Sequence, residues 1–303
     1  MATPIITNAS QLDFTLADLP DMPRPKGVML VKPDHFDIQY VINPYMADHI
    51  GNVDKAAATA QWNAIRDIYQ SLGLEVHEVA SQPGLPDMIF CANQSLPFLN
   101  GDPATDNRRE VIMSIMNADE RKDEVAFIEQ WYRQNGYLIH HLDPNTIPRF
   151  EGMGDAIWHA GKRLLWGGYG FRSSLEAYET IGETVGVPII ALRLEDPNFY
   201  HLDTCFCSLT EDTALFFPEA FDQTGLELLQ ALYPNLLPVN RHEAHELFAC
   251  NANCPDGQNV VIQKGCVETT AALKNAGFTV HEVDTTEYLK CGGSVFCMKM
   301  MVW

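Results

Sequence analysis

A repeated pairing of two short segments is the feature that most constrains the fold of this 303-residue chain. The first segment of each pair is apolar. The second segment follows further along the chain and begins with polar or glycine residues. The pairs are LEVHEV with PDMIFCAN, YLIHHL with FEGMGDAIW, PIIALRL with YHLDTCFCSL, NLLPV with ELFACNANC, and FTVHEV with GGSVFCMKMMVW. We interpret both segments as strands, and their recurrence every 40 to 60 residues, roughly, predicts modules repeated around an axis.

Helical patterns separate these pairs. Apolar residues recur at helical spacing, and several of the patterns end at a glycine, as α-helices commonly do. We expect helices within residues 53–73, 123–136, 174–186, 221–234 and 266–277. Strands that alternate with helices indicate an α/β fold. In such a repeat, polar residues at corresponding strand starts would converge at one central place.

Composition and charge exclude several classes of function. The chain has 40 acidic and 20 basic residues, a net charge of −20 and no run rich in Lys or Arg, which argues against a nucleic-acid partner. Its eight cysteines are too dilute for a disulfide scaffold and fit reduced thiols in the cytoplasm. The N-terminus resembles neither a signal peptide nor a membrane anchor. We expect residues 1–26 to form an extended arm and residues 27–303 to form one catalytic domain.

The segment FYHLDTCFCSL, residues 199–209, places a histidine and an aspartate two positions apart. Read as a strand, it would project His201 and Asp203 from the same face. Similar polar residues begin the other second segments: Asp87, Asn93, Glu151, Asp155 and Cys297. Clustered carboxylates are costly unless a cation joins them, and the planar N–H fork of a guanidinium matches carboxylates well.

Four motifs resemble the signature set of the guanidine-modifying enzymes. They are HLDT at 201–204, FEGMGD at 150–155, PD followed six residues later by Asn93, and GGSVFCM at 292–298. This superfamily includes arginine deiminases, dimethylarginine dimethylaminohydrolases and amidinotransferases. The resemblance implies a five-bladed α/β propeller (pentein) of ββαβ units around a central active site, which acts on a small guanidine substrate without a cofactor or metal.

The resemblance also implies roles for individual residues. Cys297 would be the nucleophile that forms a covalent amidino-thioether, His201 the acid and base, and Glu151 the residue that orients His201. Asp87 and Asp203 would bind the guanidinium. Arg121 in ERKDE and Arg172 in GYGFRSS would bind the substrate carboxylate, although Arg108 and Arg109 compete with Arg121 for that role.

A closer resemblance is to the arginine dihydrolase branch known from cyanobacteria. It is carried by KPDHFDIQYVINPYM at 32–46, FCAN at 90–93, ERKDE at 120–124 and FACNA at 248–252. The implied reaction converts free arginine to ornithine, carbon dioxide and two ammonia. Asn93, which replaces the Asp usual in deiminases, would hold the neutral intermediate for a second attack, and Asn43 and Asn251 complete the implied substrate-binding set.

Several alternatives stay open on the sequence. Asp155 could equally bond turn amides as take part in catalysis. The activity could be that of an arginine deiminase, a dimethylarginine dimethylaminohydrolase or an amidinotransferase, and a propeller that only binds arginine or a metal-dependent enzyme are further classes. The intact set of Cys, His and Glu argues against a binding protein, and the lack of a second histidine at ligand spacing argues against a metal. The sequence leaves a homo-oligomer open.

Overall fold

The computed structural model describes residues 4–101 and 108–303, and the first repeat shows how the chain is built. β2 (Gly27–Val31) runs parallel to β3 (Glu75–Val79), and α1 (Lys55–Ser71) connects them. β15 (Met300–Val302) pairs antiparallel with the other edge of β2. One sheet therefore joins strands from the two ends of the described chain, which closes the repeats into a ring.

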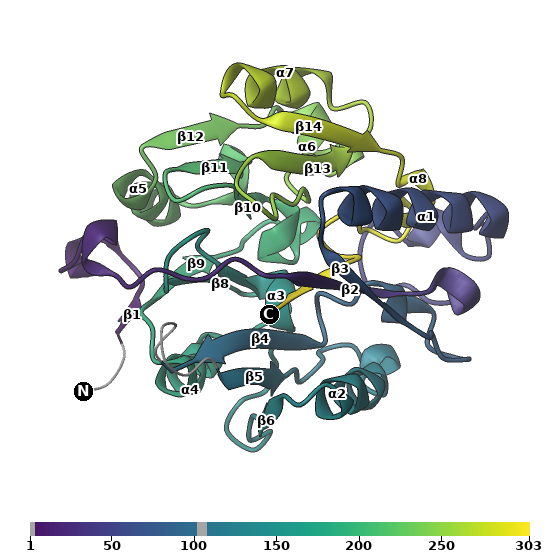
Figure 1. The fold of residues 1–303 in the computed structure, drawn as a ribbon, viewed down its shortest axis with the longest axis horizontal. Helices are drawn as coiled ribbons and strands as arrows, with labels where there is room; N and C mark the ends of the chain where they lie inside the picture. Colours follow the sequence, from purple (N-terminus) through teal and green to yellow (C-terminus); the bar gives the residue numbers. More distant parts are fainter. Residues whose placement is uncertain (1–3, 102–107) are drawn as a thin grey trace.

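The same order of an antiparallel inner pair, a helix and a parallel outer strand recurs along the chain. Within residues 4–101 and 108–303 there are five sheets, which form a five-bladed α/β propeller with its helices at the periphery (Figure 1). The next three repeats are β4 (Ser95–Asn100), β5 (Arg108–Met113), α2 (Glu124–Gln134) and β6 (Leu138–His141); β7 (Ala156–Trp158), β8 (Leu165–Tyr169), α4 (Leu175–Val185) and β9 (Ile189–Arg193); and β10 (Phe206–Ser208), β11 (Thr213–Phe216), α5 (Gln223–Leu232) and β12 (Asn235–Pro238).

The fifth repeat departs from this pattern. β13 (Asn259–Gln263), α7 (Val267–Asn275) and β14 (Thr279–Val283) form the parallel pair and its helix. In place of an inner strand there is an isolated antiparallel bridge between Asn253 and Val261. Two short helices, α6 (Arg241–Leu247) and α8 (Thr286–Leu289), flank this repeat along the chain.

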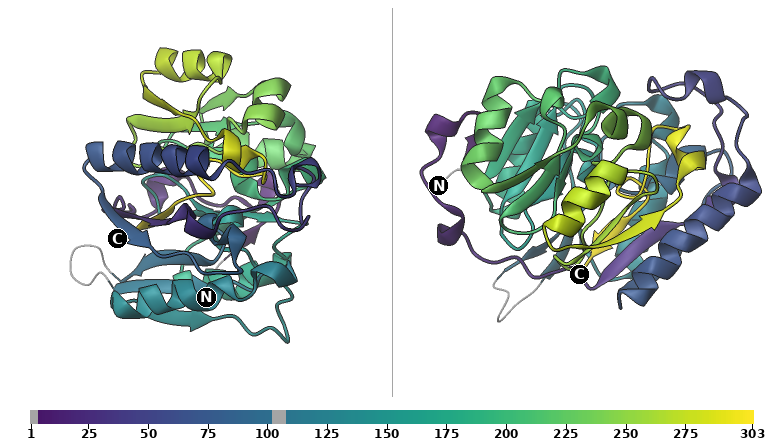
Figure 2. Two further views of the ribbon diagram at one scale, coloured as in Figure 1. Left: turned by 90° about the vertical axis from the view of Figure 1, so that its right-hand side faces the viewer. Right: turned by 90° about the horizontal axis from the view of Figure 1, so that it is seen from above.

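The segment before β2 runs along the outside of the molecule (Figures 1 and 2). Its strand β1 (Ile5–Ile6) pairs parallel with β9 and so extends the third sheet by one strand. Further along, Trp303 Nε1 donates a hydrogen bond to the Pro23 carbonyl oxygen at 2.7 Å. The boundary between an arm at residues 1–26 and a domain at 27–303 remains a prediction.

The five helices predicted from apolar periodicity are confirmed as α1, α2, α4, α5 and α7. Their ends have identifiable causes. The Asp54 carboxylate accepts hydrogen bonds from the Ala56 and Ala57 amides and caps the start of α1. α4 ends at Gly186, whose φ of 66° is left-handed and favours glycine. No helix among the described residues is long and apolar enough to cross a membrane.

The interpretation of the second segments as strands from their first residues is wrong. Pro86–Ile89 and Leu202–Thr204 are 3₁₀ turns, and Gly152–Asp155 is the short helix α3. In a strand, the backbone N–H and C=O groups form hydrogen bonds with neighbouring strands. In these turns, backbone groups are free to form hydrogen bonds with side chains instead. The Leu202 amide, for example, donates to Asp155 Oδ1 at 3.0 Å. His201 and Asp203 therefore do not share the face of a strand.

Candidate active site

The turns before the inner strands converge on a small cavity. It has a volume of about 20 Å³, which is room for about one water molecule. Seven of the ten predicted site residues line it: Asn43, Asp87, Asn93, Arg121, Arg172, His201 and Cys297. The other three, Glu151, Asp203 and Asn251, lie fully buried behind the wall and bond to lining residues. The sequence therefore predicted the membership of this cluster, although it misjudged the elements that carry it.

Cys297 lies in the turn that precedes β15. Its Sγ donates a hydrogen bond to Asp203 Oδ2 at 3.1 Å and accepts one from Asn251 Nδ2 at 3.2 Å. Asn251 Oδ1 in turn accepts hydrogen bonds from the backbone amides of Ser294, Phe296 and Cys297 at 3.1 to 3.2 Å. Asn251 thus fixes the shape of the turn that presents the thiol, and the structure gives it no place on the cavity wall.

The surroundings of Cys297 favour the protonated thiol over the thiolate. Burial raises its pKa well above the ordinary thiol value, and the neighbouring Asp203 carboxylate raises it further. Burial also raises the pKa of Asp203 to about 7, although the hydrogen bond from Cys297 opposes that shift. A cation that entered the cavity would reverse both effects, because it stabilises a thiolate and a carboxylate together.

His201 and Glu151 form a buried pair. His201 Nε2 lies 2.7 Å from Glu151 Oε2, and the same oxygen accepts a hydrogen bond from Arg172 Nη1 at 3.1 Å. Burial alone would raise the pKa of Glu151, but Arg172 and His201 hold it well below its usual range. Glu151 is therefore an anion that fixes the orientation of the imidazole.

One carboxylate, Asp87, lines the cavity, and a second, Asp203, lies directly behind its wall. Asp203 Oδ1 is buried and has no hydrogen-bond partner among the described residues. Burial raises the pKa of Asp87, and the nearby Arg121 guanidinium only partly opposes this. Cys291 Sγ donates to Asp87 Oδ1 at 3.2 Å, a contact that we did not predict from the sequence. A guanidinium would supply the N–H donors that such carboxylates lack.

Only one of the two polar side-chain atoms of Asn93 forms a hydrogen bond with another described residue. Its Oδ1 accepts a hydrogen bond from Arg121 Nη1 at 2.8 Å, while its buried Nδ2 has no partner in the part of the chain that the structure describes. A Cβ added at Gly154 would collide with that Nδ2 and lie 3.3 Å from the His201 ring. The free amide N–H group and the imidazole therefore meet around the same glycine.

The two arginines on the wall are tied to the protein framework. Arg121 Nη2 lies 2.9 Å from Glu124 Oε2 and also donates to the carbonyl oxygens of Asp87 and Phe90. Arg172 donates to the Ile42 carbonyl oxygen at 2.7 Å in addition to Glu151. Binding of a substrate carboxylate by either guanidinium would have to use its remaining N–H groups or displace a present partner.

Arg109 lies elsewhere. It donates to the Asn135 carbonyl oxygen at 2.9 Å, and its guanidinium lies over the Tyr137 ring, 5.0 Å from the centroid. Arg121 is therefore the better candidate of the two for this cavity. Its partner Glu124, also within ERKDE, was missed as a site residue, although its i+3 spacing from Arg121 on a helix start was a usable signal.

Ile42 and Asn43, in the segment between β2 and α1, line the cavity. Asn43 Nδ2 donates to the Cys291 carbonyl oxygen at 3.0 Å, and the Tyr45 hydroxyl donates to that of Asn198 at 3.3 Å. A cavity of about 20 Å³ is smaller than an amino acid, so part of its wall has to move before such a molecule can enter. Within the described residues, no group of three or more His, Cys, Asp or Glu side chains is arranged to hold a metal ion.

Fold and site together define a five-bladed α/β propeller with a small central cavity, around which a cysteine, a histidine–glutamate pair and two buried aspartates cluster. No protein-family model matches the chain. The N(G),N(G)-dimethylarginine dimethylaminohydrolase of Mycobacterium tuberculosis is 35% identical over 283 residues, which cover 92% of this chain and 87% of that protein. The bifunctional arginine dihydrolase/ornithine cyclodeaminase ArgZ of Synechocystis is 35% identical over 281 residues, or 91% of this chain.

The match to ArgZ covers 37% of that longer protein. The crystal structure of its N-terminal domain bound to product, described as an arginine dihydrolase, superposes with a TM-score of 0.83 at 34% identity and covers 91% of this chain and 97% of that domain. A variant of the same domain has been solved covalently bonded to a reaction intermediate. The chain therefore belongs to the superfamily of guanidine-modifying enzymes, and it is homologous to guanidino-group hydrolases.

Proposed function

We propose that this protein is a cysteine-dependent arginine dihydrolase, which converts free L-arginine to ornithine, carbon dioxide and two ammonia. The observation that carries the proposal is the unpartnered Nδ2 of Asn93 beside the His201 ring. An amide donor is suited to a neutral ureido oxygen, whereas a carboxylate at this position would favour only the cationic guanidinium.

The first half of the reaction removes one ammonia. The guanidinium lies between Asp87 and Asp203, and its charge stabilises the thiolate of Cys297. The sulfur adds to the guanidinium carbon, a C–N bond breaks, and ammonia leaves with a proton from His201. His201 then takes a proton from water, the oxygen adds to the same carbon, and the C–S bond breaks to give citrulline and the thiolate.

The second half repeats these steps on the ureido group. Asn93 Nδ2 holds its oxygen, so that citrulline remains in a pose open to attack by Cys297. The sulfur adds again, the second ammonia leaves, and water releases the carbamate of ornithine, which loses carbon dioxide. Arg121, Arg172 and Asn43 hold the amino-acid end of the substrate, and Asn251 keeps the nucleophile in place for both rounds.

The test is a search for the covalent intermediate during turnover. We expect protein quenched in acid while it consumes arginine to gain the mass of arginine less one ammonia. Cys297→Ala should show no such adduct and should consume arginine at least about a thousandfold more slowly, because nothing replaces the nucleophile. Cys266→Ala, the same change in a cysteine at the start of α7, should retain both the adduct and the activity. Full arginine turnover by Cys297→Ala would contradict the proposal.

A second candidate is hydrolysis of a methylated arginine. It is favoured by the 35% identity to the mycobacterial enzyme named for dimethylarginine. Comparison of kcat/KM for arginine and for N(G),N(G)-dimethylarginine separates the two. The dihydrolase proposal expects arginine to be the better substrate by about tenfold or more, and the reverse order would favour the second candidate.

A further inference from the structure

Two thiols face the small catalytic cavity, and each of them donates a hydrogen bond to an aspartate. Cys297 Sγ donates to Asp203 Oδ2 at 3.1 Å, and Cys291 Sγ donates to Asp87 Oδ1 at 3.2 Å. Both cysteines and Asp87 line the cavity, whereas Asp203 lies behind its wall. The mechanism proposed above uses Cys297 and both aspartates, and it leaves the second thiol without a role.

The backbone around Cys291 is held firmly on both sides. The Cys291 carbonyl oxygen accepts a hydrogen bond from Asn43 Nδ2 at 3.0 Å, and the Gly292 carbonyl oxygen accepts one from the Tyr200 hydroxyl. Gly292 has a left-handed φ of 79°, and a Cβ at this position would collide with the Tyr200 hydroxyl and the Asn43 side chain. These contacts fix the position from which the thiol reaches Asp87.

The Asp87 carboxylate depends on neighbouring donors and cations, because only 2% of the residue is exposed. Burial raises the pKa of Asp87, and the Arg121 guanidinium, followed by the Cys291 thiol, opposes that shift. The guanidinium is bonded to the Asp87 backbone carbonyl oxygen at 3.1 Å and to the Glu124 carboxylate. The Cys291 thiol, by contrast, bonds the Asp87 carboxylate itself.

A thiol suits a carboxylate that also has to receive a cation. It offers one weak donor and carries no positive charge. Cys291 can therefore fix one oxygen of Asp87 and leave the negative charge of the carboxylate for a ligand. Without the thiol, a buried oxygen of Asp87 would lose this donor, which is costly for a charged group.

We propose that Cys291 is a positioning residue for substrate binding, whose thiol holds the Asp87 carboxylate in the orientation that receives the positive charge of arginine. The inference rests on the proposed function, because it places an arginine cation in this cavity. Cys291 takes no part in the covalent chemistry, which belongs to Cys297.

The first test is arginine binding to protein that lacks the nucleophile. Isothermal titration of the Cys297→Ala protein with L-arginine at pH 7 measures Kd without turnover. We expect the additional change Cys291→Ala to weaken binding at least about tenfold, because a buried carboxylate loses a donor. Cys291→Ser restores a donor, and its Kd should stay within about threefold of the Cys297→Ala protein. Unchanged affinity after Cys291→Ala, or equally weak binding by the alanine and serine variants, would overturn the proposal.

Steady-state kinetics separate this role from a general structural effect. With Cys297 present, Cys291→Ala should raise the KM for arginine at least about tenfold and change kcat by no more than about threefold. The matched control is Cys266→Ala, which removes the thiol of a buried cysteine outside the cavity and should alter neither constant. A fall in kcat with an unchanged KM in Cys291→Ala would contradict a role in binding.

Thermal melting checks that each variant is folded. If the alanine variant is unfolded, Cys291→Val replaces it in both measurements, since valine also lacks a donor and fills more of the space left by the thiol.

The inference and the proposed function fail in different ways. Unmodified protein that neither binds nor consumes arginine would exclude both. Protein that consumes arginine, but binds it equally tightly after Cys291→Ala, would overturn the inference alone and leave the proposed dihydrolase activity intact.

Discussion

Asn93 is the residue on which the number of ammonia molecules released depends. Asn93→Asp would keep the acceptor for Arg121 and replace the free N–H group by a second carboxylate oxygen. A carboxylate repels a ureido oxygen, so citrulline should leave before the second attack. We predict that the ratio of ornithine to citrulline falls at least tenfold, roughly the effect of one lost hydrogen bond that becomes a repulsion. Chromatography of the products after full arginine consumption measures it.

The control for this prediction is Asn235→Asp, the same chemical change at an exposed position on β12. It should leave the product ratio unchanged. An unaltered ratio of ornithine to citrulline in Asn93→Asp would show that Asn93 does not determine the product.

Cys297 gives a prediction about pH. Burial and the Asp203 anion disfavour the thiolate, so the pKa of Cys297 is raised and the reactive form appears only at alkaline pH. We predict that alkylation of Cys297 by iodoacetamide, followed by peptide mass spectrometry, accelerates about tenfold per pH unit from pH 7 to 9 without a plateau. Asp203→Asn should lower the pKa and raise the rate at each pH. A plateau below pH 8 in the unmodified protein would contradict this reading of the site.

For individual residues, the sequence predicted which ones cluster at the cavity, but it predicted their hydrogen-bond partners less well. Motif order brought Cys297, His201 and Asn93 to one cavity. It could not reveal that Asn251 bonds the turn around Cys297. That contact depends on side-chain directions within turns, and local periodicity carries no information about these directions.

The element on which the nucleophile depends is the turn from Gly292 to Lys299, held from across the structure by Asn251. Asn251→Ala leaves the buried Ser294 and Cys297 N–H groups without their acceptor, while Phe296 keeps its bond to the backbone carbonyl oxygen of residue 251. We predict a loss of unfolding free energy of about 2 kcal/mol or more and at least a tenfold fall in kcat, because the thiol is no longer held in register. Chemical denaturation and steady-state kinetics measure the two effects.

Asn240→Ala is the matched control for that element. Asn240 caps α6 by accepting a hydrogen bond from the Glu243 amide at 2.9 Å, so its loss should cost about 1 kcal/mol. The kcat of this variant should be unchanged. If both variants lost the same stability and neither lost activity, Asn251 would be an ordinary structural asparagine.

Helices were predictable as elements, and the inner strands were not. α1 and α4 have long apolar periodicity and clear ends, whereas the inner strands β7 and β10 are three residues each. So short a strand leaves little periodic signal, and the polar turn in front of it looks like its continuation. The candidate site residues belong to those turns. The prediction that His201 and Asp203 share one face of a strand was therefore wrong, whereas the prediction that they lie near one central site was correct.

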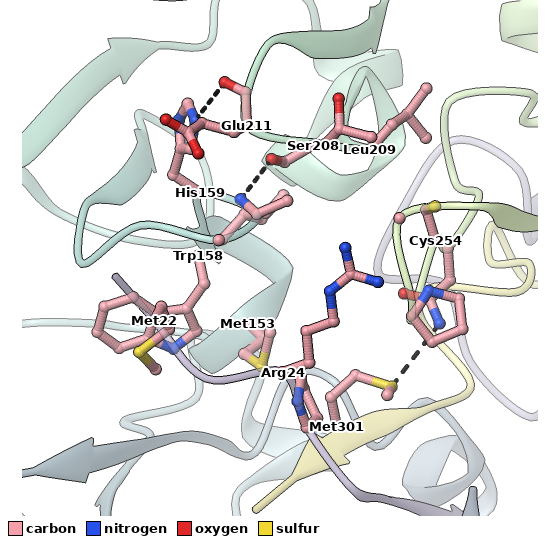
Figure 3. Close-up of a pocket in the computed structure, with 18 of the residues that line it drawn as sticks. Met22, Arg24, Met153, Trp158, His159, Ser208, Leu209, Glu211, Cys254 and Met301 are labelled. Carbon is pink, nitrogen blue, oxygen red and sulfur yellow. Dashed lines mark hydrogen bonds between the residues drawn. The ribbon is translucent and has the colours of Figure 1, made fainter. Parts of the chain in front are cut away.

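At the scale of the whole molecule, the repeat predicted modules around an axis and the family resemblance implied a five-bladed propeller, and the fold confirms both. Recurrence of apolar segments separated by helices required modules around an axis, and the pairing of β15 with β2 closes that ring. The sequence did not predict that the fifth repeat would have a bridge at Asn253 instead of an inner strand. Nor did it assign a task to the segment before β2, of which Met22, Pro23, Arg24 and Pro25 line a cavity of about 200 Å³ (Figure 3).

The most direct test of the central claim is the stoichiometry of products from L-arginine. Purified protein is incubated with arginine until the substrate is consumed, and ornithine, citrulline, urea and ammonia are quantified together. We predict one ornithine and two ammonia per arginine, with no urea and only transient citrulline. One citrulline and one ammonia per arginine as the final products would contradict it, since Asn93 would then support a single round of hydrolysis.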